Sequence, residues 1–107
     1  MSRSVKFGKS DAVVRNILDV LGKYEEEHAK AKIDVYRQND VAVRIRIIDP
    51  DFSGKDLGER DAMVWTFLDE LPDEAISEIT LLLLFTPKET KKSFANMEFE
   101  NPVPTMP

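Results

Sequence analysis

The segment Asp49-Pro50-Asp51-Phe52-Ser53-Gly54 carries the residue types of a calcium-binding loop. It has side-chain oxygens at positions 1, 3 and 5 and a glycine at position 6, as an EF-hand loop has. The remainder of that pattern is missing, because Arg60 stands where the bidentate glutamate belongs and an expected strand precedes the loop in place of a helix. We therefore expect a strand-to-helix turn here and no metal site.

His28 is the only histidine, and the chain has no cysteine. These counts exclude a His-rich metal site, a Cys-ligated zinc site, a disulfide framework and a thiol nucleophile. His28 lies near the polar end of an expected helix, where a cation is favourable, so we interpret it as a capping or surface residue. No Gly-x-Ser-x-Gly or Ser-x-x-Lys motif accompanies the serines. We expect no enzymatic activity and no cofactor.

The periodicity of apolar residues predicts the elements that hold these side chains. Apolar side chains recur at helical spacing over 11–29 and 57–70, and they alternate over 32–37 and 41–48, which predicts two helices and a β-hairpin. Pro72 restarts a short helix, and the apolar run 79–85 predicts a strand buried on both faces, although its repeated leucines also suit a helix. Asp56 with Glu59 and Thr86 with Glu89 have capping-box spacing, so a helix should begin at each, the second one carrying Phe94 and Met97.

These elements predict an α+β fold in the order α-β-β-α-α-β-α. The sheet has three strands and is mixed, because the crossover from the hairpin to the third strand is long enough to make that pair parallel. The helices lie on one face, and the strand 32–37 forms an edge at which two copies could pair. We expect one domain over 1–97 and an extended or disordered tail over 98–107, which holds three prolines.

Charge narrows the choice of partners. The 107 residues carry a net charge of −5, but residues 1–50 have a net charge of +2 and residues 51–107 one of −7. Nucleic-acid binding would rest on Arg37, Arg44 and Arg46, on or beside the hairpin. The other interpretation is a solvated sheet face on which Asp34 pairs with an arginine of the neighbouring strand. The chain has no signal-peptide pattern and no apolar run long enough to span a bilayer, so we expect a cytoplasmic protein with no membrane contact.

Several segments together resemble the BolA-like family of small regulators, which have a type II KH-like fold. The similar segments run from Ile45 through the loop 49–55 into Glu59-Arg60-Asp61 and Val64-Trp65, and then over Leu84-Phe85-Thr86-Pro87-Lys88-Glu89. The resemblance extends over about residues 11–92. It implies the same α+β architecture and a regulatory role without catalysis.

The resemblance also implies a protein partner, a monothiol glutaredoxin in that family, bound through the loop 49–56 and the helix 57–70. Arg60, Asp61 and Trp65 are the corresponding partner-binding residues. Trp65 lies at the edge of the apolar stripe of its helix, so packing at the edge of the core is the other interpretation of this residue. Asp61 takes the position of the histidine that the family uses to hold a shared iron–sulfur cluster, and we expect no such cofactor here. The main hypothesis is therefore an adaptor domain that binds a protein, and the alternative is a nucleic-acid-binding module.

Overall fold

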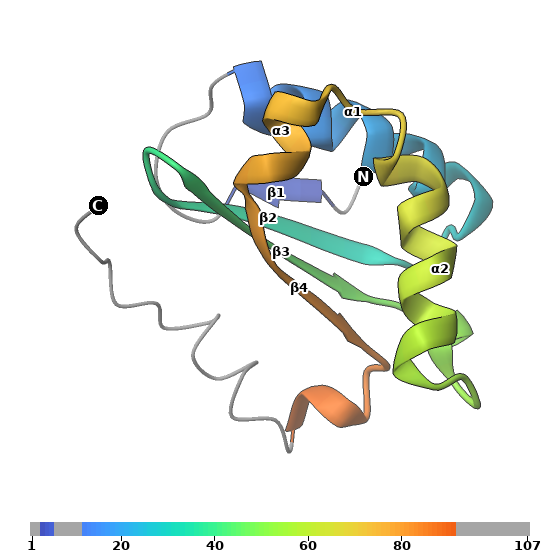
Figure 1. The fold of residues 1–107 in the computed structure, drawn as a ribbon. Helices are drawn as coiled ribbons and strands as arrows, with labels where there is room; N and C mark the ends of the chain where they lie inside the picture. Colours follow the sequence, from blue (N-terminus) through green and yellow to red (C-terminus); the bar gives the residue numbers. More distant parts are fainter. Residues whose placement is uncertain (1–2, 6–11, 92–107) are drawn as a thin grey trace.

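A mixed β-sheet lies at the centre of the computed structural model, which describes residues 3–5 and 12–91 (Figure 1). The predicted three strands are β2 (Lys32–Asn39), β3 (Ala42–Ile48) and β4 (Ile79–Phe85), with β2 antiparallel to β3 and β3 parallel to β4. A fourth, three-residue strand, β1 (Arg3–Val5), pairs in parallel with β2, and the order across the sheet is β1-β2-β3-β4. The α+β fold and its mixed sheet are confirmed, with β1 as an addition.

The predicted edge of the sheet is wrong, because β1 covers it. Residues Arg3–Val5 pair with Ile33–Val35 of β2, so β2 is an inner strand over that stretch. Among residues 3–5 and 12–91, strand β4 ends the sheet on the other side.

The expectation that β4 is buried on both faces is also wrong, because β4 is an edge strand there. Only Leu84 of β4 is buried, and the other apolar residues of the strand are half-buried. An apolar run of this length is typical of an inner strand, but only the pairing order decides where the strand lies.

Three helices pack on one face of the sheet: α1 (Ala12–Glu27), α2 (Leu57–Leu68) and α3 (Asp73–Glu78) (Figure 1). Side chains alternate along a strand, so every second register pair of β2 and β3 lies on this face: Ile33 with Ile47, Val35 with Ile45 and Arg37 with Val43. Each fully buried aliphatic side chain contributes about 1.5–3 kcal/mol to folding, and this layer is the main source of stability. The fully buried members of the core include Ile33, Val35, Val43, Ile45 and Ile47 from the sheet and Val14, Ile17, Leu21, Tyr24, Val64 and Leu68 from the helices.

The two predicted capping boxes form. The Asp56 carboxylate accepts the Glu59 N–H at 2.8 Å, and the Glu59 carboxylate accepts the Asp56 N–H at 3.2 Å, which starts α2. The Thr86 N–H donates to Glu89 at 2.8 Å, and the Glu89 N–H donates to the Thr86 hydroxyl at 3.4 Å. The second box leads into a short 3-10 helix, Glu89–Lys91. Phe94, Met97 and the tail 98–107 lie outside the described residues.

Candidate functional site

Arg60, predicted to bind a partner, lies inside the junction between α2 and the end of β4. Its guanidinium makes two parallel hydrogen bonds to the Glu89 carboxylate, of 2.6 Å and 3.0 Å. It also donates to the carbonyl oxygens of Leu84 at 3.1 Å and Lys55 at 2.9 Å, and it lies 5.7 Å from the centre of the Phe52 ring. Its side chain is only 8% exposed. Arg60 therefore ties the loop, α2 and β4 together beneath the surface.

Glu89 completes this ion pair at the surface. The Arg60 guanidinium and the Thr86 N–H stabilise its charged form, and together they lower the pKa of the Glu89 carboxyl to about 2. Its side chain remains 43% exposed, so water screens part of this attraction. The pair is thus neutral overall, and the guanidinium donates to both oxygens of the carboxylate.

Asp61 and Trp65 lie on the side of α2 next to β4. Asp61 is exposed and lines a groove of about 350 Å³ between α2 and β4, whose other walls are Leu57, Gly58, Leu82 and Leu84. Trp65 follows one helical turn later, on the same side of α2, where it is half-buried and packs against the core. The structure therefore brings two of the three predicted partner-binding residues to one side of the helix, with Arg60 behind them.

The hairpin arginines do not form one basic face. Arg46 forms the predicted ion pair with Asp34 of the neighbouring strand, but the prediction that this part of the sheet face is solvated is wrong, since both residues are buried and Arg46 is 2% exposed. Arg44, on the same face, donates to Gln38 at 2.9 Å. Arg37 is in register with Val43 and so lies on the face that carries the helices, where it donates to Glu78 of α3 at 2.8 Å.

The segment 49–56 connects a strand to a helix, as predicted. The Asp49 carboxylate accepts the Asp51 N–H at 2.9 Å and caps a 3-10 helix, Pro50–Phe52. Gly54 has a φ of 79°, a conformation that favours glycine, and it turns the chain toward α2. The Asp49 N–H also donates to the Phe85 carbonyl at 2.8 Å, which extends the pairing of β3 with β4 and fixes the position of Asp49.

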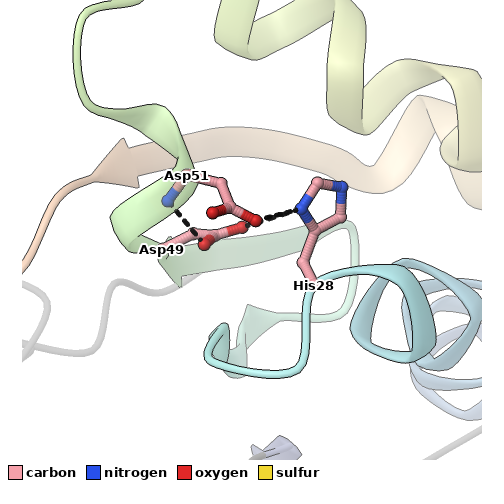
Figure 2. A group of neighbouring side chains, drawn as sticks. All are labelled: His28, Asp49 and Asp51. Carbon is pink, nitrogen blue, oxygen red and sulfur yellow. Dashed lines mark hydrogen bonds and ion pairs between the residues drawn. The ribbon is translucent and has the colours of Figure 1, made fainter.

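A cluster that the sequence analysis did not foresee joins this turn to the end of α1. The Nδ1 atom of His28 lies 2.7 Å from an Asp51 carboxylate oxygen and 3.5 Å from one of Asp49 (Figure 2). Asp49 is fully buried, and the His28 side chain is 21% exposed. His28 is thus not simply a surface or capping residue, because it contacts two aspartates that lie 21 and 23 positions further along the chain.

Tyr24 supports this cluster from the preceding turn of α1. Its hydroxyl donates to the Asp49 carboxylate at 2.6 Å, and its ring stacks on the His28 ring with centroids 4.2 Å apart. Burial, with the hydrogen bond to Asp49 next in size, raises the pKa of the Tyr24 hydroxyl, so it stays protonated and remains a donor. The i, i+4 spacing of Tyr24 and His28 was visible in the sequence, but nothing there indicated that Asp49 would lie against them.

A shallow cavity of about 680 Å³ opens beside the cluster. His28 and Asp51 form part of its wall, and Figure 2 shows the second ring nitrogen of His28 pointing away from both carboxylates. The remaining lining residues come from the end of α1, from the loop before α2 and from the segment 63–70: Glu27, Lys55, Met63, Thr66, Phe67 and Glu70.

No family model, no curated protein and no solved structure matches the chain. Within residues 3–5 and 12–91, no helix has the length and the apolar character to cross a bilayer.

Proposed function

We propose that this protein is a non-enzymatic adaptor domain that binds an extended segment of a partner protein along β4 and α2. The observation that carries the proposal is the combination of a sheet edge and an apolar groove at one place. In the described part of the chain, no strand pairs with the outer edge of β4. The groove between α2 and β4 runs beside this edge, and Leu57 at its rim is 74% exposed.

The backbone of β4 supports recognition by strand addition. An edge strand presents N–H and C=O groups that an extended peptide can match, and side-chain pockets beside it provide specificity. The apolar residues of β4 other than Leu84 are only half-buried, whereas large apolar side chains are usually buried in the core. An added strand would cover them and would place alternate side chains over Leu82 and Leu57.

The charge around the groove favours a basic segment. Among the described residues that line the groove, Asp61 is the only charged one. Residues 51–91, which include α2, α3 and β4, hold four Lys or Arg against ten Asp or Glu, a net charge of −6. One of those four, Arg60, is already neutralised by Glu89. A partner segment that alternates apolar residues with Lys or Arg would be complementary to this surface.

The BolA-like resemblance supports the same surface. Asp61 stands where that family has its histidine and lies in the groove, while Trp65 lies one turn away. A monothiol glutaredoxin is the partner class that the resemblance suggests, and it belongs in the first binding tests. The hairpin arginines give no support to a second proposal, since Arg46 and Arg37 are mostly buried in ion pairs.

A synthetic peptide tests the proposal directly. The probe is a peptide of about nine residues, near the upper length of natural strands, that alternates Val with Lys, and its counterpart alternates Val with Glu. We expect the basic peptide to bind and the acidic peptide not to bind, measured by calorimetry and by the fluorescence of Trp65, the only tryptophan in the chain. A monothiol glutaredoxin is titrated in parallel.

Two variants with the same change of charge distinguish binding in the groove from a general effect of the net charge of the protein. Asp61→Lys should weaken binding of the basic peptide about tenfold, because it places a like charge in the groove. Asp40→Lys, in the exposed hairpin turn, should have little effect. Equal effects of the two variants, or no binding of either peptide, would contradict the proposal. A dimer seen by sedimentation and abolished by Leu57→Ser would identify a second copy of the chain as the occupant instead.

A further inference from the structure

We infer that His28, Asp49 and Asp51 form a binding site for a divalent transition-metal ion of the Zn²⁺ type. The inference is independent of the groove between α2 and β4. It rests on three donor atoms from two separate elements, on their unbalanced charge, on the side chains that orient them and on the cavity beside them (Figure 2).

The spacing of the donor atoms suits one ion. The His28 nitrogen and one carboxylate oxygen each from Asp49 and Asp51 all lie within 4.8 Å of one another. Around a tetrahedral Zn²⁺ with bonds of about 2.0–2.2 Å, neighbouring donor atoms are roughly 3.3–3.6 Å apart. The separation of 3.5 Å between His28 and Asp49 matches this value. The separation of 2.7 Å between His28 and Asp51 must widen, and the Asp51 side chain is 57% exposed, so it has room to move.

The charge of the cluster favours a cation. Two carboxylates share one imidazole, so the cluster keeps a net negative charge even when His28 is protonated. In the described part of the chain, neither carboxylate forms an ion pair with a lysine or arginine. Asp49 is fully buried, and its carboxylate is held by the Tyr24 hydroxyl and the Asp51 N–H, neither of which carries a full positive charge. A divalent ion would neutralise both carboxylates at once.

The surroundings already orient two of the three donor groups. The Tyr24 hydroxyl and the Asp51 N–H each hold one oxygen of Asp49, and stacking on Tyr24 fixes the plane of the His28 ring. Such supporting contacts typically change metal affinity by about 10–100-fold. His28 and Asp51 also line the cavity, so a bound ion would be accessible and could complete its coordination with water.

The chemical types of the three ligand atoms favour some metal ions over others. One imidazole nitrogen and two carboxylate oxygens are common ligands of Zn²⁺ and similar ions. Ca²⁺ prefers six to eight oxygen ligands, and this site offers only two carboxylates and a nitrogen. We therefore expect Zn²⁺ and Co²⁺ to bind and Ca²⁺ and Mg²⁺ to bind far more weakly.

Calorimetry of the full, untagged chain tests the site, with Zn²⁺ as the probe after removal of metals by a chelator. We expect one Zn²⁺ per chain and a rise in Tm. Because the chain has one histidine and no cysteine, a shift of the single set of imidazole NMR signals reports on His28 alone. No stoichiometric binding, or binding that leaves these signals unchanged, would overturn the inference.

Matched variants assign the ligands. Asp51→Asn and His28→Gln should each weaken Zn²⁺ binding by at least about 100-fold, more than loss of a supporting contact does. Asp19→Asn, an exposed carboxylate elsewhere on α1, should leave the affinity unchanged. If Asp51→Asn and Asp19→Asn bind Zn²⁺ equally well, the ion is held elsewhere and the assignment is wrong. Circular dichroism of each metal-free variant confirms that it is folded.

Discussion

Two ionic clusters lie at the two ends of the loop between β3 and α2. Each pairs a basic side chain with carboxylates, but the two differ in their balance of charge. At one end Arg60 meets Glu89 and two backbone carbonyls. At the other end His28 meets both Asp49 and Asp51. Both clusters join residues more than 20 positions apart, and each contains a buried charged residue.

The difference between them is the balance of charge and donors. The guanidinium of Arg60 has a full carboxylate partner, and two of its other N–H groups donate to carbonyl oxygens, so the junction is neutral and closed. The imidazole of His28 faces two carboxylates, and a cavity opens beside it. A neutral cluster with most of its donors paired stabilises the fold. A cluster with excess negative charge and an opening is suited to a further cation. Four changes, taken from the largest expected effect to the smallest, test this distinction.

Arg60→Met should have the largest effect on stability. It leaves the Glu89 carboxylate without its cation and the Leu84 and Lys55 carbonyls without a donor. Breaking a buried ion pair costs about 3–5 kcal/mol, and the exposure of Glu89 places this case at the lower end, near 3 kcal/mol. Urea denaturation measures the loss. Arg15→Met, an exposed position on α1, is the control, and a similar loss in both would show that Arg60 does not hold the junction.

Tyr24→Phe should lower the free energy of unfolding by about 2 kcal/mol. The change removes the 2.6 Å hydrogen bond to Asp49 and leaves part of a fully buried carboxylate without a donor. Denaturation in the absence of metal measures this loss. Added Zn²⁺ should restore part of it if the ion neutralises Asp49. A loss below about 0.5 kcal/mol would mean that Asp49 is not dependent on Tyr24.

Acid should weaken the Arg60–Glu89 junction over a defined range. The pKa of Glu89 is about 2 in the folded protein, below its ordinary value of 4.5, so the pair stabilises the fold fully above about pH 4.5 and loses its effect as the pH falls through 2. Screening at the half-exposed carboxylate limits the contribution to about 1 kcal/mol. Glu89→Gln should flatten this part of the curve of stability against pH, whereas Glu74→Gln, at an exposed position, should not.

Asp51→Asn should change stability least, by no more than about 0.5 kcal/mol. It removes an attraction to His28 but also a repulsion between two neighbouring carboxylates, and its side chain is mostly exposed. The same variant should lose Zn²⁺ binding. A loss above about 1 kcal/mol in metal-free protein would mean that the cluster is a closed structural ion pair like that of Arg60.

The sequence predicted the elements of this fold well because their signals are local. Alternation over 41–48 and the capping box of Asp56 with Glu59 depend on residues a few positions apart, and the structure has the expected hairpin and helix there. The sequence did not predict the short strand β1, because three residues are too few to show the alternation of apolar and polar side chains that marks a strand. The open edge at β4 was missed because an apolar run does not specify how many neighbours a strand has.

The candidate sites were less predictable because they depend on distant residues. Asp61 and Trp65 were chosen from a resemblance, and the groove beside them exists only because β4 lies next to α2. The spacing of Asp49 and Asp51 in the sequence suits a comparison with a calcium loop, whereas the third residue of their cluster, His28, lies 21 positions before Asp49 in the chain.

The sequence by itself determined the helices α1, α2 and α3 and the strands β2, β3 and β4, and it excluded thiol chemistry, since the absence of cysteine is a fact of composition. The tertiary structure alone decided which charges are neutralised and which are not. Charge balance depends on distances between side chains that lie far apart in the chain. Packing placed Glu89 against Arg60 and a second carboxylate against His28, and that difference separates the closed junction from the site we assign to a metal ion.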